Sequence, residues 1–212
     1  GTSEDIGQAV SVDSSGNVYT TGWFNNRADF DPGAGTTFNL TSSGIASDIF
    51  ISKLNGNGNF VWARAMGGAS SADVGYGIAV DPAGNVYTTG GFSDTADFDP
   101  GAGTSLLTSA GNEDIFISKL DSGGLYVWAK AMGGPLADYG NDIAVSPTGA
   151  VHTTGFFQGI ADFNPGPATF NLVSAGFEDI FICRLAGPDP VVDAAFPWVM
   201  FLPAITGKGR VQ

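Results

Sequence analysis

A pair of aspartates separated by one residue occurs in a glycine-rich context at two places in the chain, and an Asp/Asn pair takes its place at a third. The motif is Asp-Phe-Asp-Pro-Gly-Ala-Gly at residues 29–35 and again at 97–103, and it returns as Asp-Phe-Asn-Pro-Gly at 162–166. Oxygen atoms of this kind in one loop can bind a calcium ion, with backbone carbonyls completing its shell. The candidate calcium ligands are therefore Asp29, Asp31, Gly33, Asp97, Asp99, Gly101, Asp162 and Asn164.

A structural interpretation of the same motif stays open. Asp-Pro-Gly is typical of a tight turn, which Asp31 would start while Phe30 packs in a core. The motif also lacks the distal acidic residue that completes an EF-hand loop. Further carboxylates that the fold could bring to such a loop are Asp48, Asp114 and Asp179, or Glu113 and Glu178. Calcium is thus one interpretation and a plain turn is the other.

The sequence offers little for catalysis. His152 is the single histidine, and it occupies the position that Tyr19 and Tyr87 hold in related segments, which favours a half-exposed strand residue over a general base. The single cysteine, Cys183, excludes an intrachain disulfide and is expected to be a small residue facing the core. Nearly every polar motif recurs, whereas a catalytic site is a single asymmetric arrangement. We expect a protein that is not an enzyme.

Composition restricts the fold and the partners. The chain has 32 Gly and 11 Pro among 212 residues, which is typical of many short strands joined by turns. Its 21 acidic and 8 basic residues give a formal charge of −13, which would repel a nucleic acid. The longest apolar run, residues 194–205, is shorter than the ~20 residues that a membrane span needs. The chain begins at Gly1 without a signal peptide, which suggests a processed product.

One unit of about 66 residues occurs three times in the chain. The first two units share Gly-Asn-Val-Tyr-Thr-Thr-Gly, then the acidic motif, then Asp-Ile-Phe-Ile-Ser-Lys-Leu, and continue into Val-Trp-Ala-Arg/Lys-Ala-Met-Gly-Gly. The third unit has Gly-Ala-Val-His-Thr-Thr-Gly and Asp-Ile-Phe-Ile-Cys-Arg-Leu at the corresponding places. The third departs after Leu185. The expected domains are residues 1–68, 69–134 and an incomplete 135–187, followed by an apolar docking tail at 188–212.

Turn residues alternate with β-branched and aromatic runs in each unit, which predicts about four antiparallel strands and a short fifth near Thr104–Leu107. In the strand from Ile115 to Leu120, isoleucines face one side while Phe116 and Leu120 face the other. Trp62 and Trp128 recur in a strand pattern, which favours packing between units over binding of a sugar ring. A glycan site would depend on Trp23 and on Tyr76 and Tyr139, expected in loops.

Three segments together carry a family resemblance. They are Gly-Ile-Ala-Val-Asp-x-x-Gly-Asn-Val-Tyr-x-Thr-Gly, Asp-Ile-Phe-Ile-Ser-Lys-Leu-Asp and Trp-Ala-Lys-Ala-Met-Gly-Gly. This sequence resembles the bacterial SBBP β-propeller repeat over about residues 5–185, in a variant with Asp-Phe-Asp-Pro-Gly-Ala-Gly. The resemblance implies a propeller-like stack of sheets in a secreted or cell-surface protein and implies no particular chemistry. The predicted fold is all-β, with three propeller-like blades of about four antiparallel strands each and an extended apolar tail.

Three blades cannot close a propeller, which usually has four to eight. Exposed faces must then be covered, and the apolar C-terminal tail is a candidate cover. It could fold back on its own third blade, insert as a strand into a neighbouring subunit, or act as an export signal. Its expected assembly residues are Phe196, Trp198, Val199, Met200, Phe201, Leu202 and Ile205.

Two functional hypotheses follow. The first is an extracellular structural protein that self-assembles into a filament or ring when its tail docks on a neighbouring subunit. The second is a monomeric calcium-dependent ligand-binding or adhesion module from a larger bacterial surface protein. The expected partner is another copy of the chain, a glycan has only slight support, and neither a nucleic acid nor a membrane is expected.

Overall fold

A computed structural model describes residues 1 and 3–185, and these residues form an all-β protein. They make three large antiparallel sheets in which the strands follow one another almost in chain order. The first sheet contains β1 (Asp5–Val12), β2 (Val18–Phe24), β5 (Asp48–Leu54) and β6 (Phe60–Met66). The second contains β7 (Val74–Val80), β8 (Val86–Asp97), β9 (Leu106–Leu120) and β10 (Tyr126–Met132). The third contains β11 (Tyr139–Val145), β12 (Val151–Phe157) and β15 (Asp179–Leu185).

A hairpin interrupts each large sheet between its second and third strands. The first sheet carries β3 (Arg27–Asp29) paired with β4 (Asn39–Thr41), and the third carries β13 (Ile160–Asp162) paired with β14 (Asn171–Val173). In the second sheet β8 and β9 simply run on into this hairpin, with Asp97 opposite Leu106. The fifth strand expected near Thr104–Leu107 is therefore the beginning of β9 in this sheet.

Sequence explains the turn between the first two strands of the first and second sheets, whereas in the third Ser146 replaces the aspartate and accepts a hydrogen bond from the amide of Ala150. The carboxylate of Asp81 accepts hydrogen bonds from the backbone amides of Ala83 and Asn85, both at 2.9 Å. Gly84 has a φ of 82°, a conformation that glycine adopts without cost. Asp13 makes the corresponding bonds to Ser15 and Asn17, so the Asp-x-x-Gly-Asn segment is a self-contained turn.

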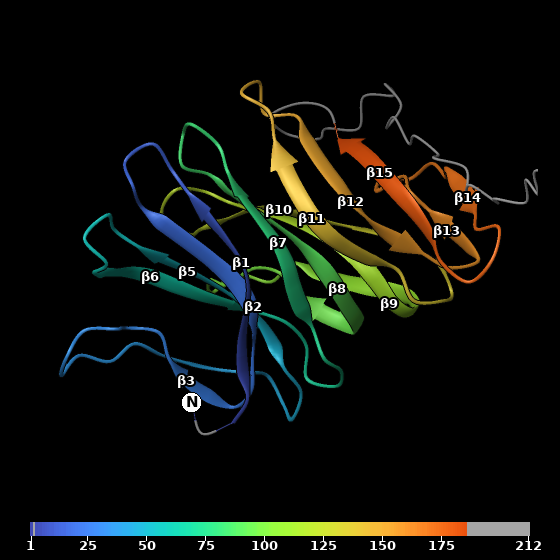
Figure 1. Cartoon of the computed structure of the whole chain (residues 1–212). Coiled ribbons are helices and arrows are strands. Elements are labelled where there is room, and N and C mark those ends of the chain that lie inside the picture. Colours follow the sequence, from blue (N-terminus) through green and yellow to red (C-terminus); the bar gives the residue numbers. More distant parts are fainter. Residues whose placement is uncertain (2, 186–212) are drawn as a thin grey trace, which may run out of the picture.

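The three sheets stand side by side like the blades of a propeller (Figure 1). β7 packs between β1 and β11, so the first strand of each sheet lies next to the first strand of its neighbour. Within each complete sheet the fourth strand, β6 or β10, is at the opposite edge. This is the arrangement of propeller blades, whose first strands surround a common axis.

The hydrophobic core lies in the two junctions between sheets. We call the face of a sheet that packs on the following sheet its front face, and the opposite face its rear face. Ile115 and Ile117 of β9 are fully buried in the front junction with the third sheet, whereas Phe116 and Leu120 are buried in the rear junction with the first. The predicted alternation along this strand is confirmed, and β9 has both faces buried because it belongs to the middle sheet.

The phenylalanine of the acidic motif anchors the hairpin to its sheet. Phe98 packs on Phe92 and Phe116 with ring centroids 5.3 and 5.0 Å apart. The same triad is built in the third sheet by Phe157, Phe163 and Phe181. Phe30, which the sequence placed in a core, is half-buried against Phe24 and Phe50, and its counterparts Phe98 and Phe163 are fully buried.

The end of the chain is outside this description. The apolar tail and its expected assembly residues, from Phe196 to Ile205, lie beyond the described residues. Across residues 1 and 3–185, no helix has the length and hydrophobicity to cross a membrane. The third sheet has three strands in the same part of the chain, with β15 at its edge.

Candidate functional site

The acidic motif forms a closed loop at the tip of the β3–β4 hairpin. Asp29 accepts hydrogen bonds through Oδ1 from the backbone amides of Asp31, at 3.1 Å, and Phe38, at 2.8 Å. Asp31 accepts one through its own Oδ1 from the amide of Gly33, at 2.8 Å. These bonds lower the pKa of Asp29, because they stabilise its charged form. Both carboxylates therefore help to hold the turn.

The other two copies of the motif form the same loop. Asp97 accepts bonds from the amides of Asp99 and Ser105, and Asp162 accepts bonds from those of Asn164 and Phe170. Asn164 bonds the amide of Gly166 through Oδ1 as Asp31 bonds that of Gly33, so this turn does not require a carboxylate at its third position.

The predicted calcium ligands thus lie together within each loop, but the three loops belong to different sheets and do not converge. Over the described part of the chain, no group of three or more His, Cys, Asp and Glu side chains has an arrangement suited to a metal ion. Calcium binding stays a prediction that would depend on one loop at a time.

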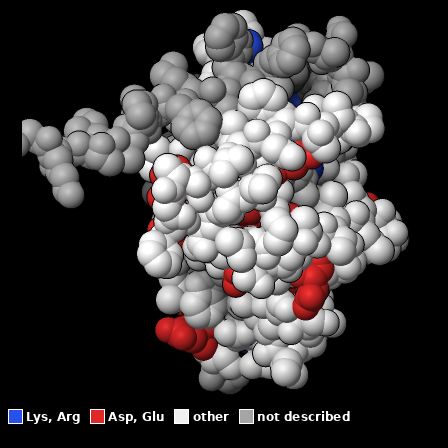
Figure 2. All heavy atoms as spheres, turned by 90° about the vertical axis from the view of Figure 1, so that its right-hand side faces the viewer, with Lys and Arg blue, Asp and Glu red and all other residues white. Residues whose placement is uncertain are grey.

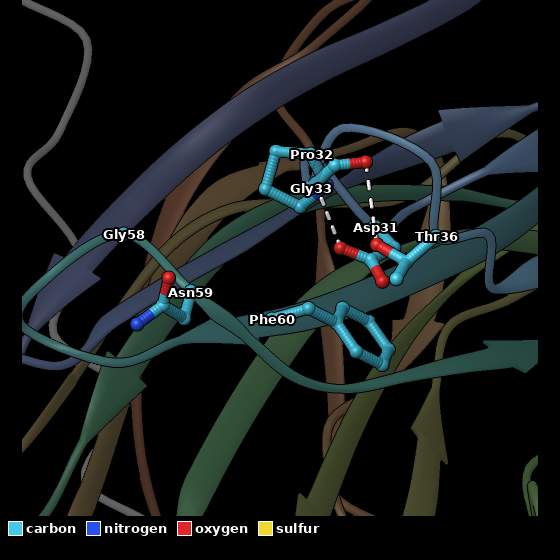
Figure 3. Close-up of a pocket in the computed structure, with 7 residues that line it drawn as sticks. All are labelled: Asp31, Pro32, Gly33, Thr36, Gly58, Asn59 and Phe60. Atoms are coloured by element: carbon cyan, nitrogen blue, oxygen red, sulfur yellow. Dashed lines mark hydrogen bonds between the residues drawn. The ribbon is translucent and has the colours of Figure 1, made fainter.

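An open hollow of about 350 Å³ lies beside the first loop. It is bounded by the Asp31–Thr36 turn on one side and by the Gly58–Phe60 end of the β5–β6 hairpin on the other (Figure 3). Figure 3 shows the ring of Phe60 beneath the loop, with Thr36 donating a hydrogen bond to the carbonyl of Gly33. The groups that border the hollow are an aromatic ring, a hydroxyl, an amide and a carboxylate.

A pair of buried carboxyl groups occupies the first junction. Asp48 begins β5 on the first sheet, and Asp73 precedes β7 on the second. Asp73 accepts hydrogen bonds from the amides of Gly68 at 2.7 Å and Ser93 at 3.2 Å. Asp48 accepts one through Oδ2 from the amide of Ser43, while its buried Oδ1 has no hydrogen-bond partner. Burial raises the pKa of Asp48 to about 6 and that of Asp73 to about 7.

The second junction repeats this arrangement. Asp114 accepts a bond from Ala110, and its Oδ1 is again buried without a partner. Asp138 accepts bonds from the amides of Gly134 and Gln158. Burial raises the pKa of Asp114 to about 7 and that of Asp138 to about 6. Sequence reasoning missed Asp73 and Asp138; their signal is an aspartate four or five residues after the Gly-Gly pair in each copy.

The end of the third sheet exposes side chains that are buried elsewhere. Ile180 and Ile182 of β15 correspond to Ile115 and Ile117 of β9, which are fully buried, yet they are 51% and 38% exposed. Thr154 is exposed as well, whereas its counterpart Thr89 is buried. Figure 2 shows this end of the molecule as a largely uncharged surface with a few separate acidic patches. In the described residues the front face of the third sheet is an uncovered junction face.

The part of the rear face of the first sheet that β1 forms is uncovered in the same way, whereas Phe50 on that face packs on Phe30 of its own hairpin. Val10 of β1 is 63% exposed, whereas its counterparts Ile78 and Ile143 are buried in the two junctions. Gly7 has open space where a side chain would be, whereas its counterpart Gly75 touches the first sheet. The row of three sheets, which we call the arc, therefore has an exposed rear face at one end, on the first sheet, and an exposed front face at the other end, on the third.

The single cysteine and the single histidine of the chain both lie in strands of the third sheet. Cys183 is buried in the second junction, 3.8 Å from the sulfur of Met132, and burial raises the pKa of its thiol to about 12. His152 is half-buried in β12. The expectation of a core-facing cysteine is confirmed.

The aromatic candidates divide between the junctions and the strands. Trp62 and Trp128 are buried in the first and second junctions, as the packing interpretation predicted. Tyr76 and Tyr139 lie in β7 and β11 with ring centroids 5.9 Å apart, so their predicted place in loops was wrong. The glycan hypothesis stays a prediction.

Comparison with known proteins supports the propeller architecture. Residues 61–90, from β6 into β8, match the family model of the SBBP β-propeller repeat. The chain is also 28% identical over 178 residues to the uncharacterized WD repeat-containing protein L264 of Acanthamoeba polyphaga mimivirus. That alignment covers 72% of this chain and 12% of the viral protein, so the chain spans a small part of this relative's length. The resemblance to the SBBP repeat is confirmed, and a bacterial origin stays a prediction.

Proposed function

We propose that this propeller module is a non-enzymatic structural protein of the extracellular space or cell surface that self-assembles into a homopolymer. The observation that carries the proposal is the exposure of Ile180 and Ile182 on the third sheet, where the equivalent isoleucines of the other sheets are fully buried. Exposed apolar area of this kind favours association, because burying it releases about 25 cal/mol per Å².

The repetition of polar groups supports a role without catalysis. The acidic loops recur in all three sheets, and the buried carboxyl pair recurs in both junctions. Each group has a local structural task that its copy also performs. A net charge of −13 keeps such a module soluble outside the cell until its end faces meet a partner.

The apolar tail is the second element of the proposal. It follows β15, the edge strand of the third sheet in the described residues. In the first two sheets a fourth strand, β6 or β10, pairs with the strand equivalent to β15. The tail could supply this missing strand to its own sheet or to that of a neighbour, with main-chain hydrogen bonds providing affinity.

Sedimentation velocity tests self-assembly. The intact chain is expected to form species larger than its 21.7 kDa monomer as concentration rises from about 1 to 100 µM. Ile182→Asp places a charge on the bare front face and should shift the distribution toward monomer. Ile45→Asp is the matched control, since Ile45 is almost fully exposed in a loop and should leave the distribution unchanged. A monomer at every concentration would overturn the proposal.

Deletion of residues 193–212 distinguishes assembly through the apolar tail from assembly through the exposed sheet faces. Loss of polymer with a folded remainder would assign assembly to the tail, as the sequence predicts. Polymer that survives the deletion and is lost in Ile182→Asp would assign it to the sheet faces. The circular dichroism spectrum of the β-sheets controls for folding in both variants.

The second candidate function is a calcium-dependent ligand-binding or adhesion module. The hollow between the Asp31 loop and Phe60 favours it, because a carboxylate borders a cavity that is open to solvent. Thermal unfolding with about 2 mM CaCl2 or with EDTA tests it, since an ion bound to the folded state raises the midpoint. Asp31→Asn should reduce that rise while keeping the turn, which Asn164 forms in the third copy. Equal midpoints with and without calcium would count against the module.

A further inference from the structure

The two internal junctions define which groups meet when one sheet packs on the next. A Cβ on Gly75, at the rear of the second sheet, would collide with Oγ1 of Thr21 and lie 3.2 Å from Cγ2 of Ile49 on the first sheet. In the second junction Gly140 meets Thr89 and Ile115 in the same way, again with 3.2 Å to the isoleucine methyl. Each junction thus inserts a threonine and an isoleucine of the front face against a glycine of the rear face.

The two ends of the arc hold the halves of a third such junction. Gly7 occupies the position of Gly75 and Gly140, and a Cβ built on it has no atom within 4 Å. Thr154 and Ile180 occupy the positions of the inserted threonine and isoleucine, and both are exposed. The receiving glycine and the inserting pair are therefore on opposite ends of one chain.

The buried carboxyl groups follow the same pattern. In the internal junctions Asp48 and Asp114 come from the front face, while Asp73 and Asp138 come from the rear. Asp179 at the front of the third sheet and Asp5 at the rear of the first occupy the corresponding positions. An end-to-end contact would bring both halves of the polar pair together, as each internal junction does.

We propose that the occupant of each end face is a second copy of this chain, docked head to tail, with Thr154 and Ile180 of one copy inserted against Gly7 of the next. The inference rests on the proposed self-assembly and specifies its interface. The contact continues an interface that the chain already builds twice. Two front faces would oppose isoleucine to isoleucine without a glycine to receive the threonine, so the contact is heterologous and forms a ring or an open filament.

Disulfide trapping between copies tests this register. Across the second junction, Cβ of Thr89 lies 3.3 Å from a Cβ built on Gly140. Disulfides join Cβ atoms about 3.5–4.5 Å apart, so cysteines at the equivalent positions 7 and 154 need a shift of only a few tenths of an ångström. Cys183→Ser gives a background without the native thiol, because Ser52 and Ser118 hold this position in the other copies.

In that background, Gly7→Cys and Thr154→Cys are placed on two separately tagged chains, which are mixed and oxidised. The expected product is a mixed dimer linked between positions 7 and 154, identified by mass spectrometry of the disulfide peptide. It should form about tenfold faster than the control mixture of Gly7→Cys with Asn57→Cys, because docking raises the effective concentration of the paired thiols. Asn57 is exposed in the β5–β6 turn, at a position that the internal junctions do not pair with Gly75 or Gly140.

Sedimentation velocity of the Cys183→Ser chain, the background, distinguishes the two ways in which the proposal can fail. If it self-associates but the 7–154 link forms no faster than the control, or homodimers through one position dominate, the proposed register is overturned and self-assembly stands. If the background is monomeric throughout, self-assembly and the register are both overturned. A further blade from a longer chain, as the alternative occupant, would leave this chain monomeric.

Discussion

The carboxyl groups of Asp48 and Asp73 converge on the backbone of Gly67, where the first sheet passes into the second. A Cβ on Gly67 would lie 2.5 Å from Oδ1 of Asp48 and 3.0 Å from Oδ2 of Asp73. Burial removes hydration from both carboxyl groups, and the charge of Asp48 adds to this effect at Asp73, so both favour the protonated form. The junction is therefore sensitive to pH although it has no histidine.

The first prediction is that the protein is more stable at mildly acidic than at alkaline pH. The pKa values of Asp73 and Asp114 are raised from 3.8 to about 7, so the folded state binds more protons than the unfolded chain between about pH 4 and pH 7. The free energy of unfolding must fall as pH rises through this window. We expect the midpoint of thermal unfolding to be roughly 5–10 °C lower at pH 8 than at pH 5.

At still lower pH the trend reverses. Hydrogen bonds lower the pKa values of Asp13 and Asp29 below 3.8, so their contribution is lost as pH falls through those lowered values. The midpoint should thus pass through a maximum at mildly acidic pH. A midpoint that rises steadily from pH 5 to pH 8 would contradict the proposed state of the junction carboxyls.

The second prediction is that Asp48→Asn stabilises the protein at pH 8. The amide oxygen can still accept the hydrogen bond from the amide of Ser43, and the amide nitrogen replaces an oxygen that has no partner. The substitution also removes one of the two negative charges in this junction. We expect a higher thermal midpoint at pH 8, little change at pH 5, and a flatter pH profile.

Asp179→Asn is the matched control for this substitution. Asp179 has the equivalent place in the third sheet, where no following sheet encloses it in the described residues, and it accepts a hydrogen bond from Ala175. At a protein concentration low enough to keep the chain monomeric, its pH profile should follow that of the unmodified chain. If both variants gave the same profile, enclosure in the junction would not be the cause.

The third prediction concerns the close approach at Gly67. Gly67→Ala forces a methyl group against the carboxyl oxygens of both aspartates, so the junction must open or the side chains must turn away. We expect a loss of about 1–3 kcal/mol in the free energy of unfolding, measured by urea titration. Gly7→Ala is the control in dilute solution, where no second copy covers the first sheet, since its methyl group then enters open space and should cost nothing.

Much of this fold can be predicted from the sequence, because one unit repeats and its turns are explicit. The alternation of Ile115, Phe116 and Ile117 predicts a strand buried on both faces, and the structure confirms it. The Asp81 turn needs only bonds to residues within four positions, so it too is local. Strand order follows chain order, which reduces the topological alternatives.

The junction site could not be predicted in this way. Asp48 and Asp73 are far apart in sequence and belong to different sheets, so their contact depends on how two sheets pack. An aspartate near Gly-Gly is compatible with any exposed turn, and no local signal distinguishes burial from exposure. The placement of Tyr76 failed for a similar reason, since adjacent glycines indicate a loop but here belong to a strand with a bulge between Gly75 and Gly77.

The fourth prediction compares two isoleucines that the repeat makes equivalent. Ile117 is fully buried between two sheets, and Ile117→Ala removes methyl and methylene groups from a closed core. It should cost about 2–4 kcal/mol in the free energy of unfolding at any protein concentration. Ile182 has the same place on a bare face, so Ile182→Ala should cost less than about 1 kcal/mol in dilute solution.

The dependence on protein concentration shows whether Ile182 is exposed in solution or covered by a second copy of the chain. If a second copy covers the front face of the third sheet, the cost of Ile182→Ala must grow with protein concentration, because the substitution then also weakens association. Urea titrations at two concentrations about a hundredfold apart measure this difference. An equal cost for Ile117→Ala and Ile182→Ala in dilute solution would mean that this face is already closed within the single chain, and the end-to-end contact would have no surface on which to form.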